Sequence, residues 1–162
     1  AWLVNLAFFL SLALGALFLL ASGGEAVSKS IFSKGVRASG ASYTDFIAGH
    51  LEYRAGNLDT ALEWYRKALR AAPDNPDILY EIANIQVKKG QLPEARESLQ
   101  KALSADPAHT DSRFLLAGVL AATGDKAGAF KEYERVVTDD PDNEEAYLHL
   151  ATLYAEQNPA HA

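Results

Sequence analysis

One segment of the sequence returns twice at a fixed distance, and this repetition constrains the fold more than any other feature. Residues 56–73 begin with glycine, end with proline and carry a small, a bulky and a second small residue between them. The same pattern returns 34 residues later in 90–107, and again in 124–141. The three inner positions are Ala61, Tyr65 and Ala68; Ala95, Leu99 and Ala102; and Ala129, Tyr133 and Val136. Self-similarity at one period indicates a repeat protein whose units stack on one another.

Local signals place helices within each 34-residue unit. Ser42 followed three residues later by Asp45 is typical of a capping box, so we expect a helix to open at Ser42. A glycine marks the turn after the first helix of each unit, Asn57 is a candidate cap for the next helix, and Pro93 fits a first turn. The predicted units are residues 42–75, 76–109 and 110–143, a half repeat at 144–158, and a tail at 159–162.

These residues resemble the tetratricopeptide repeat, a 34-residue helix–turn–helix with small and aromatic residues at set positions. The resemblance covers residues 42–158 and implies an all-α fold, in which helix pairs stack into an α-solenoid. Small residues at Gly49, Ala61 and Ala68 would lie where paired helices approach most closely, with Tyr65 beside them. The matching residues are Gly49, Gly56, Ala61, Tyr65, Ala68 and Pro73; Leu79, Ile82, Ala83, Gly90, Ala95, Leu99, Ala102 and Pro107; Leu116, Ala117, Gly124, Ala129, Tyr133 and Pro141; and Tyr147, Leu150, Ala151 and Tyr154.

By resemblance, such arrays bind peptides in a groove lined by the first helix of each pair. Chaperone-binding members hold a carboxylate with Lys, Asn and Arg there. The corresponding positions here carry Phe46, His50, Glu81, Asp111 and Leu115, so no carboxylate clamp is expected. The groove is instead rich in aromatic residues, which are common where partners bind. The alternative is that several of these aromatic residues pack between helices or against residues 27–32 of the linker. The candidate partner-binding residues are Tyr43, Phe46, His50, Tyr53, Arg54, Tyr80, Asn84, Lys88 and Phe114.

Residues 1–21 carry no charge and would span about 30 Å as a helix, which matches the hydrocarbon thickness of a bilayer. We therefore expect an anchor or assembly helix, with a secretory signal peptide as the alternative. Small residues recur every four positions in this segment, which favours close helix packing, and an asparagine could hydrogen-bond to a neighbouring helix. Residues 22–41 are rich in glycine and serine and are typical of a linker. The candidate assembly residues are Asn5, Ala7, Ser11 and Gly15.

Composition and motifs argue against other classes of function. The net charge is −6 and no helix carries a basic stripe, so nucleic acid is not an expected partner. There is no cysteine, and the histidines at 50, 109, 149 and 161 lack the spacing of metal ligands or catalytic groups. The acidic run at 139–145 is typical of a solvated turn. No enzyme activity, cofactor or metal is therefore expected.

The leading hypothesis is a non-catalytic protein–protein interaction scaffold, anchored by residues 1–21 and taking part in a larger assembly of the cell envelope. One alternative is a processed, pilin-like subunit whose apolar helices bundle into an extracellular filament. Another is an accessory subunit of a membrane enzyme complex. We expect a homo-oligomer or a multi-subunit complex. Lys29, Lys34 and Arg37 would lie in the cytoplasm by the positive-inside rule, but a lost basic leader would reverse this bias and leave the repeats extracytoplasmic.

Overall fold

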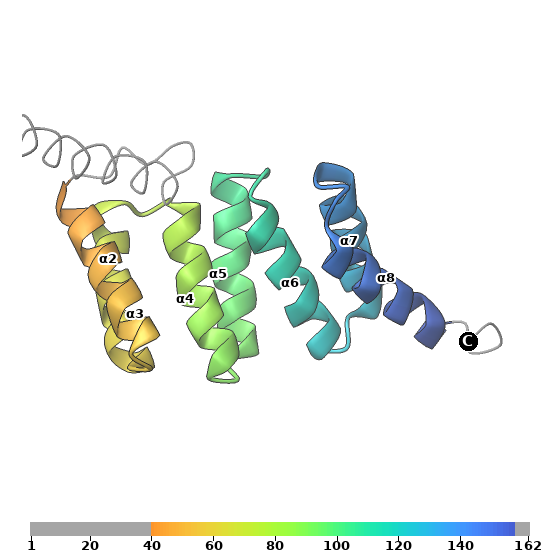
Figure 1. Ribbon diagram of the computed structural model, residues 1–162, viewed down its shortest axis with the longest axis horizontal. Coiled ribbons are helices and arrows are strands. Elements are labelled where there is room, and N and C mark those ends of the chain that lie inside the picture. Colours follow the sequence, from red (N-terminus) through yellow and green to blue (C-terminus); the bar gives the residue numbers. More distant parts are fainter. Residues whose placement is uncertain (1–39, 158–162) are drawn as a thin grey trace, which may run out of the picture. The chain divides into compact units, whose positions relative to one another are not determined.

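A computed structural model describes residues 40–157 of the chain, and these residues form seven helices and no strand (Figure 1). Consecutive helices lie side by side in chain order, from α2 in orange to α8 in blue. The predicted all-α solenoid of helix pairs is confirmed for this part of the chain. The helices are α2 (Gly40–Arg54), α3 (Leu58–Ala71), α4 (Pro76–Lys88), α5 (Leu92–Ala105), α6 (Thr110–Ala122), α7 (Lys126–Asp139) and α8 (Glu144–Gln157).

The chain divides into two units, Ala1–Arg37 and Ala38–Ala162. Several predictions fall outside the described residues: the anchor helix, its assembly residues Asn5, Ala7, Ser11 and Gly15, the linker up to residue 39, and the tail at 159–162. Within 40–157, none of the helices combines the length and the apolar character needed to cross a bilayer.

The turns between paired helices depend on three glycines. Gly56, Gly90 and Gly124 have φ angles of 84°, 73° and 88°, in the left-handed region that other residues rarely adopt. Each lies just after a first helix, as the repeat pattern predicts. The glycines therefore recur every 34 residues because each turn needs a residue that adopts a positive φ angle.

The predicted capping box at Ser42 is wrong. The helix already begins at Gly40, so Ser42 lies inside its first turn, where the side chain is buried against α3. Its hydroxyl donates a hydrogen bond to the backbone oxygen of Ala68 over 3.0 Å, and Asp45 pairs with Lys67 at 2.8 Å. The local pattern was interpreted as a cap because both residue types favour caps, whereas here they join two helices.

Asn57 stands at the predicted cap position of α3, but its side chain makes no capping bond. Its amide nitrogen donates to the carboxylate of Glu52, 2.8 Å away. The backbone at Asn57 is not extended (φ −83°, ψ 68°), unlike the conformation in which a side chain usually caps. Pro93, by contrast, lies in the first turn of α5 as predicted.

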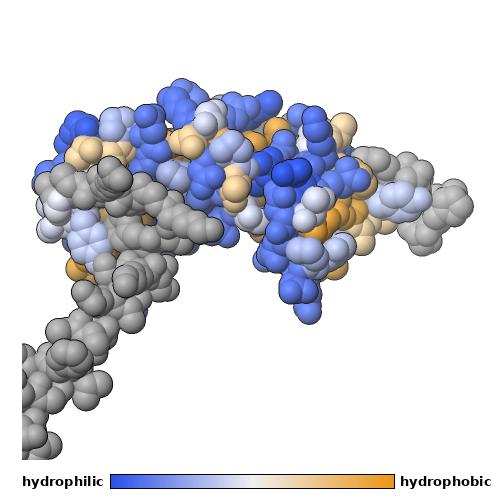
Figure 2. Space-filling view, turned by 90° about the horizontal axis from the view of Figure 1, so that it is seen from above, coloured by the Kyte–Doolittle hydropathy of each residue, from blue (hydrophilic) through white to orange (hydrophobic). Residues whose placement is uncertain are grey.

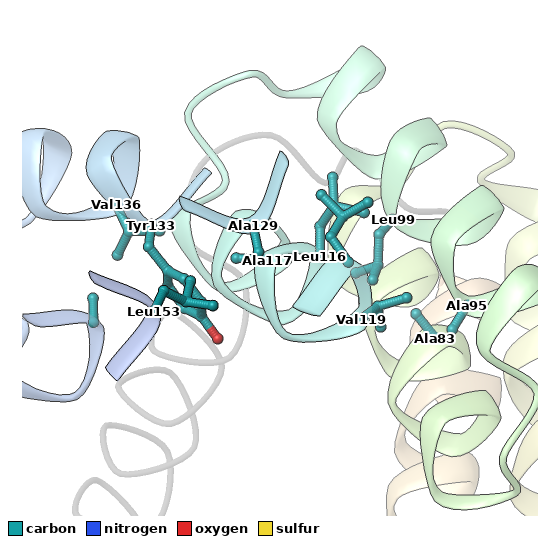
Figure 3. Close-up of a cluster of buried hydrophobic side chains, with 12 residues drawn as sticks. Ala83, Ala95, Leu99, Leu116, Ala117, Val119, Ala129, Tyr133, Val136 and Leu153 are labelled. Carbon is teal, nitrogen blue, oxygen red and sulfur yellow. The ribbon is translucent and has the colours of Figure 1, made fainter. Parts of the chain in front are cut away.

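The inner side chains of the repeat form the core. Tyr65, Leu99 and Tyr133 occupy the same repeat position and are almost fully buried, with alanine or valine at the flanking repeat positions. Gly49 is needed for this packing, because a Cβ atom there would lie 2.6 Å from two ring carbons of Tyr65. Figure 3 shows how one cluster continues from Ala83 and Leu99 through Leu116 and Val119 to Tyr133 and Leu153. The helices from α4 to α8 are thus joined by a continuous apolar core.

The outer surface of the described residues is largely hydrophilic in the view of Figure 2, with apolar surface gathered toward the C-terminal end. On α8, Tyr147 and Leu148 are exposed. Ala151 is also exposed, although Ala83 and Ala117 at the same repeat position are fully buried. The reason is that α8 has no second helix paired with it among the described residues.

Candidate peptide-binding face

The predicted partner-binding residues all lie on the first helices of the repeats. We call the surface that these side chains form, together with the side chains at equivalent repeat positions of α2, α4, α6 and α8, the first-helix face. Tyr43, Phe46, His50, Tyr53 and Arg54 lie on α2; Tyr80, Asn84 and Lys88 lie on α4; and Phe114 lies on α6. Arg54 and Lys88 are exposed and Phe46 is buried, whereas the other six side chains are half-buried.

Phe46 and His50 pack against the core tyrosine of the first repeat. The ring centroids of Phe46 and His50 are 4.6 Å apart in an edge-to-face arrangement, and each lies 5.6 Å from the ring of Tyr65. Burial lowers the pKa of His50 below its usual value, which keeps the imidazole neutral at pH 7. Packing between helices therefore accounts for Phe46, as the second interpretation of the aromatic residues expects.

The third repeat has a similar aromatic cluster. Phe114 meets Tyr133 edge to face at 5.4 Å, and the ring of His149 stacks on Tyr133 at 4.9 Å with an angle of 11° between the planes. This stacking joins α8 to α7. Packing against the core tyrosine therefore accounts for Phe114 as well.

Tyr53 and Lys88 join α2 to α4 across the face. The ammonium nitrogen of Lys88 lies 4.6 Å from the centroid of the Tyr53 ring, which is a cation–π contact. One face of this ring therefore holds a cation. Both residues belong to the predicted set, and the structure brings them together.

Three acidic residues gather at the other end of α4. Burial, followed by the nearby charges of Asp77 and Asp111, raises the pKa of Glu81 to about 7. Burial and the charges of Asp111 and Glu81 also raise the pKa of Tyr80 to about 12. One end of the face is therefore acidic and the other, at Arg54 and Lys88, is basic.

His109 holds the boundary between the second and third repeats, and our sequence interpretation missed this role. Its Nδ1 accepts a hydrogen bond from the backbone of Ser112 at 3.1 Å and so caps α6, while its Nε2 lies 3.2 Å from a carboxylate oxygen of Asp77 on α4. This contact with Asp77 raises the pKa of His109, against the effect of burial. Asn75 and Asn143 cap α4 and α8 from the same repeat position, so the 34-residue register is the signal that could have identified His109.

The outer side of the array carries a separate open cleft of about 600 Å³ between α3, α4 and α5. Its lining contains charges of both signs, which come from Arg66, Arg70, Lys101, Asp74, Glu94 and Glu97. None of the predicted partner-binding residues lines it. Within residues 40–157, no group of three His, Asp or Glu side chains is arranged as metal ligands.

Comparison with known proteins places the chain in a family. A family model described as the cilia and flagella-associated protein 70 middle TPR-like domain matches residues 46–162. No curated protein matches the chain by sequence.

Solved structures share the fold. The first TPR of Spaghetti (RPAP3), bound to the HSP90 peptide SRMEEVD, has 22% identity and a TM-score of 0.71, covering 76% of this chain and 98% of that one. The Sgt2 TPR domain from Aspergillus fumigatus has 22% identity and a TM-score of 0.69, with 76% and 83% covered. YrrB, described as a TPR protein with an unusual peptide-binding site, has 27% identity and a TM-score of 0.64, with 73% and 61% covered.

The family match and these structural likenesses agree with the repeat register, the glycine turns and the buried tyrosines. Because the matched residues make up more than half of the chain, the protein belongs to the family of the cilia and flagella-associated protein 70 middle TPR-like domain.

Proposed function

We propose that the protein is a non-catalytic interaction scaffold whose first-helix face binds an extended peptide segment of a partner protein. This proposal depends on the Tyr53–Lys88 contact and on the half-buried polar side chains of α4, Tyr80 and Asn84. These side chains belong to successive first helices and are not consumed by the core. Half-buried aromatic and charged side chains on a rigid frame are what a peptide-binding surface needs.

The comparisons support the proposal by analogy. The RPAP3 structure contains an HSP90 peptide, and YrrB is described by its peptide-binding site. The polar groups of the present face differ in arrangement from a clamp for a carboxylate, because acidic residues lie along the first helices at positions 77, 81 and 111. The partner is therefore expected to be a protein segment of a different charge from the HSP90 peptide.

The test is selection of binding peptides from a random displayed library with the full chain, followed by measured affinities for two variants. Tyr53→Ala removes the ring of the cation–π pair on the first-helix face. Trp64→Ala removes the ring of a similar pair with Lys67, at 4.7 Å, on the second helix α3, and is the matched control. We expect Tyr53→Ala to lower the affinity for the selected peptides by about tenfold, and Trp64→Ala to lower it by less than about twofold. If Tyr53→Ala leaves the affinities of the selected peptides unchanged, the first-helix face is not their binding site.

For the apolar N-terminal segment we propose an anchor that holds this scaffold at a membrane of the cell envelope, with the repeats on the extracytoplasmic side. The uncharged sequence of residues 1–21 supports the anchoring part of this proposal. Fractionation of the full chain separates it from its alternatives. Extraction that requires detergent supports the anchor, recovery as long filaments without detergent supports the pilin-like subunit, and constant co-purification with enzyme subunits supports the accessory role.

A further inference from the structure

We propose that the partner segment is basic and that Glu81 on the first-helix face receives the guanidinium group of one of its arginine side chains. This inference rests on the proposed peptide-binding function and adds the chemical class of the ligand. It is carried by a carboxylate without a cationic partner and by a buried hydroxyl without a hydrogen bond, both at the junction of α2, α3 and α4.

Glu81 is a buried carboxylate that no Lys or Arg of residues 40–157 neutralises. Its side chain is only 16% exposed, and the nearest basic group is Nε2 of His50 at 3.8 Å. That distance exceeds a hydrogen bond, and burial keeps His50 neutral. Asp77 and Asp111 add negative charge from the same face. A carboxylate in such a place is costly for the folded chain unless a cation joins it.

The hydroxyl of Tyr65 is the second observation. Tyr65 is completely buried, yet its phenol oxygen has no hydrogen-bond partner. The ring lies against Gly49 through its Cδ1, Cε1 and Cζ atoms and against the edge of His50, and the charge of Glu81 acts on the phenol. Because the charge of Glu81 acts on this phenol and raises its pKa, the carboxylate and the unpaired hydroxyl lie near each other. Unpaired buried polar groups are rare in folded proteins and call for an explanation.

A guanidinium group would satisfy this set of acceptors. It offers five N–H donors in a planar fork, of which two can bind one carboxylate and a third can reach a hydroxyl or imidazole acceptor. Its flat faces also stack on aromatic rings, and the charge of Glu81 acts on the phenol of Tyr80, so an aromatic side chain lies near the carboxylate. A lysine ammonium would supply the same positive charge but fewer hydrogen bonds of suitable geometry, so arginine is the better ligand.

The charges of the whole face point the same way. Asp77, Asp111 and Glu145 occupy one repeat position on three successive first helices, 34 residues apart. In each helix they lie in the first turn, where an acidic residue also stabilises the helix dipole. A segment that runs across these helices therefore meets carboxylates repeatedly. Such a row repels an acidic peptide such as SRMEEVD and attracts a basic one.

The experiment measures binding of labelled peptides to the full chain by fluorescence anisotropy. The probes are an acetylated, amidated peptide of alternating arginine and glycine, the same peptide with lysine or glutamine in place of arginine, and SRMEEVD. We expect the arginine peptide to bind at least threefold more tightly than the lysine peptide and far more tightly than the others. Glu81→Gln should weaken binding of the arginine peptide about tenfold. Glu94→Gln, which alters a residue of the outer cleft, should change the affinity for this peptide by less than about twofold.

Two further measurements keep the result interpretable. Tyr65→Phe removes only the unpaired hydroxyl, so it should preserve the fold while weakening the arginine peptide about threefold. Binding by the unaltered chain should strengthen from about pH 6 to about pH 8, because Glu81 ionises in that range, and Glu81→Gln should remove this dependence.

Failure of the inference differs from failure of the proposed function. An acidic or neutral peptide that binds through Tyr53 while the arginine peptide does not would overturn the inference and leave the function standing. Arginine-peptide binding that is unchanged in Glu81→Gln would also overturn it. The absence of any peptide whose affinity depends on Tyr53 would overturn the function and the inference together.

Discussion

Replacing Gly49 by alanine should destabilise the protein, although alanine is the better helix former. Gly49 lies inside α2, directly over the ring of Tyr65. An added Cβ atom would lie 2.6 Å from two carbons of that ring, which is closer than unbonded carbon atoms can approach. The ring cannot easily move away, because Tyr65 is fully buried and touches the rings of Phe46 and His50.

Two opposing effects set the size of the change. Alanine in place of glycine within a helix contributes about 1 kcal/mol of stability. Overpacking a filled core typically costs about 1–3 kcal/mol. We therefore expect Gly49→Ala to lower the free energy of unfolding by about 1 kcal/mol.

Gly118 provides the matched control. It also lies inside a first helix and faces a core tyrosine, but an added Cβ atom would meet only the hydroxyl oxygen of Tyr133, at 3.5 Å. That is an ordinary contact, so Gly118→Ala should stabilise the protein by about 0.5–1 kcal/mol. Urea denaturation of both variants measures the difference. If Gly49→Ala is as stable as Gly118→Ala, the close approach of α2 to Tyr65 does not limit this position.

Three further predictions can be checked by the same urea titrations. Arg113→Ala breaks a largely buried ion pair with Glu132 at 2.8 Å and should cost about 1–3 kcal/mol, whereas Lys126→Ala, in a half-exposed pair, should stay within about 0.5 kcal/mol. Equal losses would show that burial does not decide the value of these pairs. Glu81→Gln should match the unaltered chain near pH 4.5. It should be more stable by about 3 kcal/mol above pH 7, because the raised pKa of about 7 means that stability is lost as the pH rises from 4.5 to 7. A constant difference across this range would refute the burial of that carboxylate. Gly90→Ala should cost about 1–2 kcal/mol, since φ is 73° there, and a neutral result would mean that the turn adopts another conformation.

The 34-residue register predicted the helix pairs, the glycine turns and the buried tyrosines, because each depends on a position that recurs three times. Ser42 shows the limit of a local sequence pattern. A serine before an acidic residue fits a helix cap, but the hydroxyl instead serves Ala68 in the neighbouring helix. A local pattern cannot distinguish these two outcomes, since the partner lies 26 residues away.

The candidate face was predictable only in part. The helical register assigned Tyr53 and Lys88 to one face, but their mutual contact depends on how closely α2 and α4 pack. Glu81 entered the sequence interpretation only as a residue unsuited to a carboxylate clamp. Its burial and its distance from His50 are properties of the stacked repeats, and no feature within a single repeat reveals them.

The caps at Asn75, His109 and Asn143 also have a consequence for how such a chain can change length. Each closes one unit and opens the next with the same kind of bond, so the joints are interchangeable. Removing residues 76–109 would join Asn75 to Thr110 in an intact register, with Ser112 taking the place of Ile78 as the capped residue. Gain or loss of a whole unit can therefore lengthen or shorten the row of acidic side chains without disturbing the helices on either side.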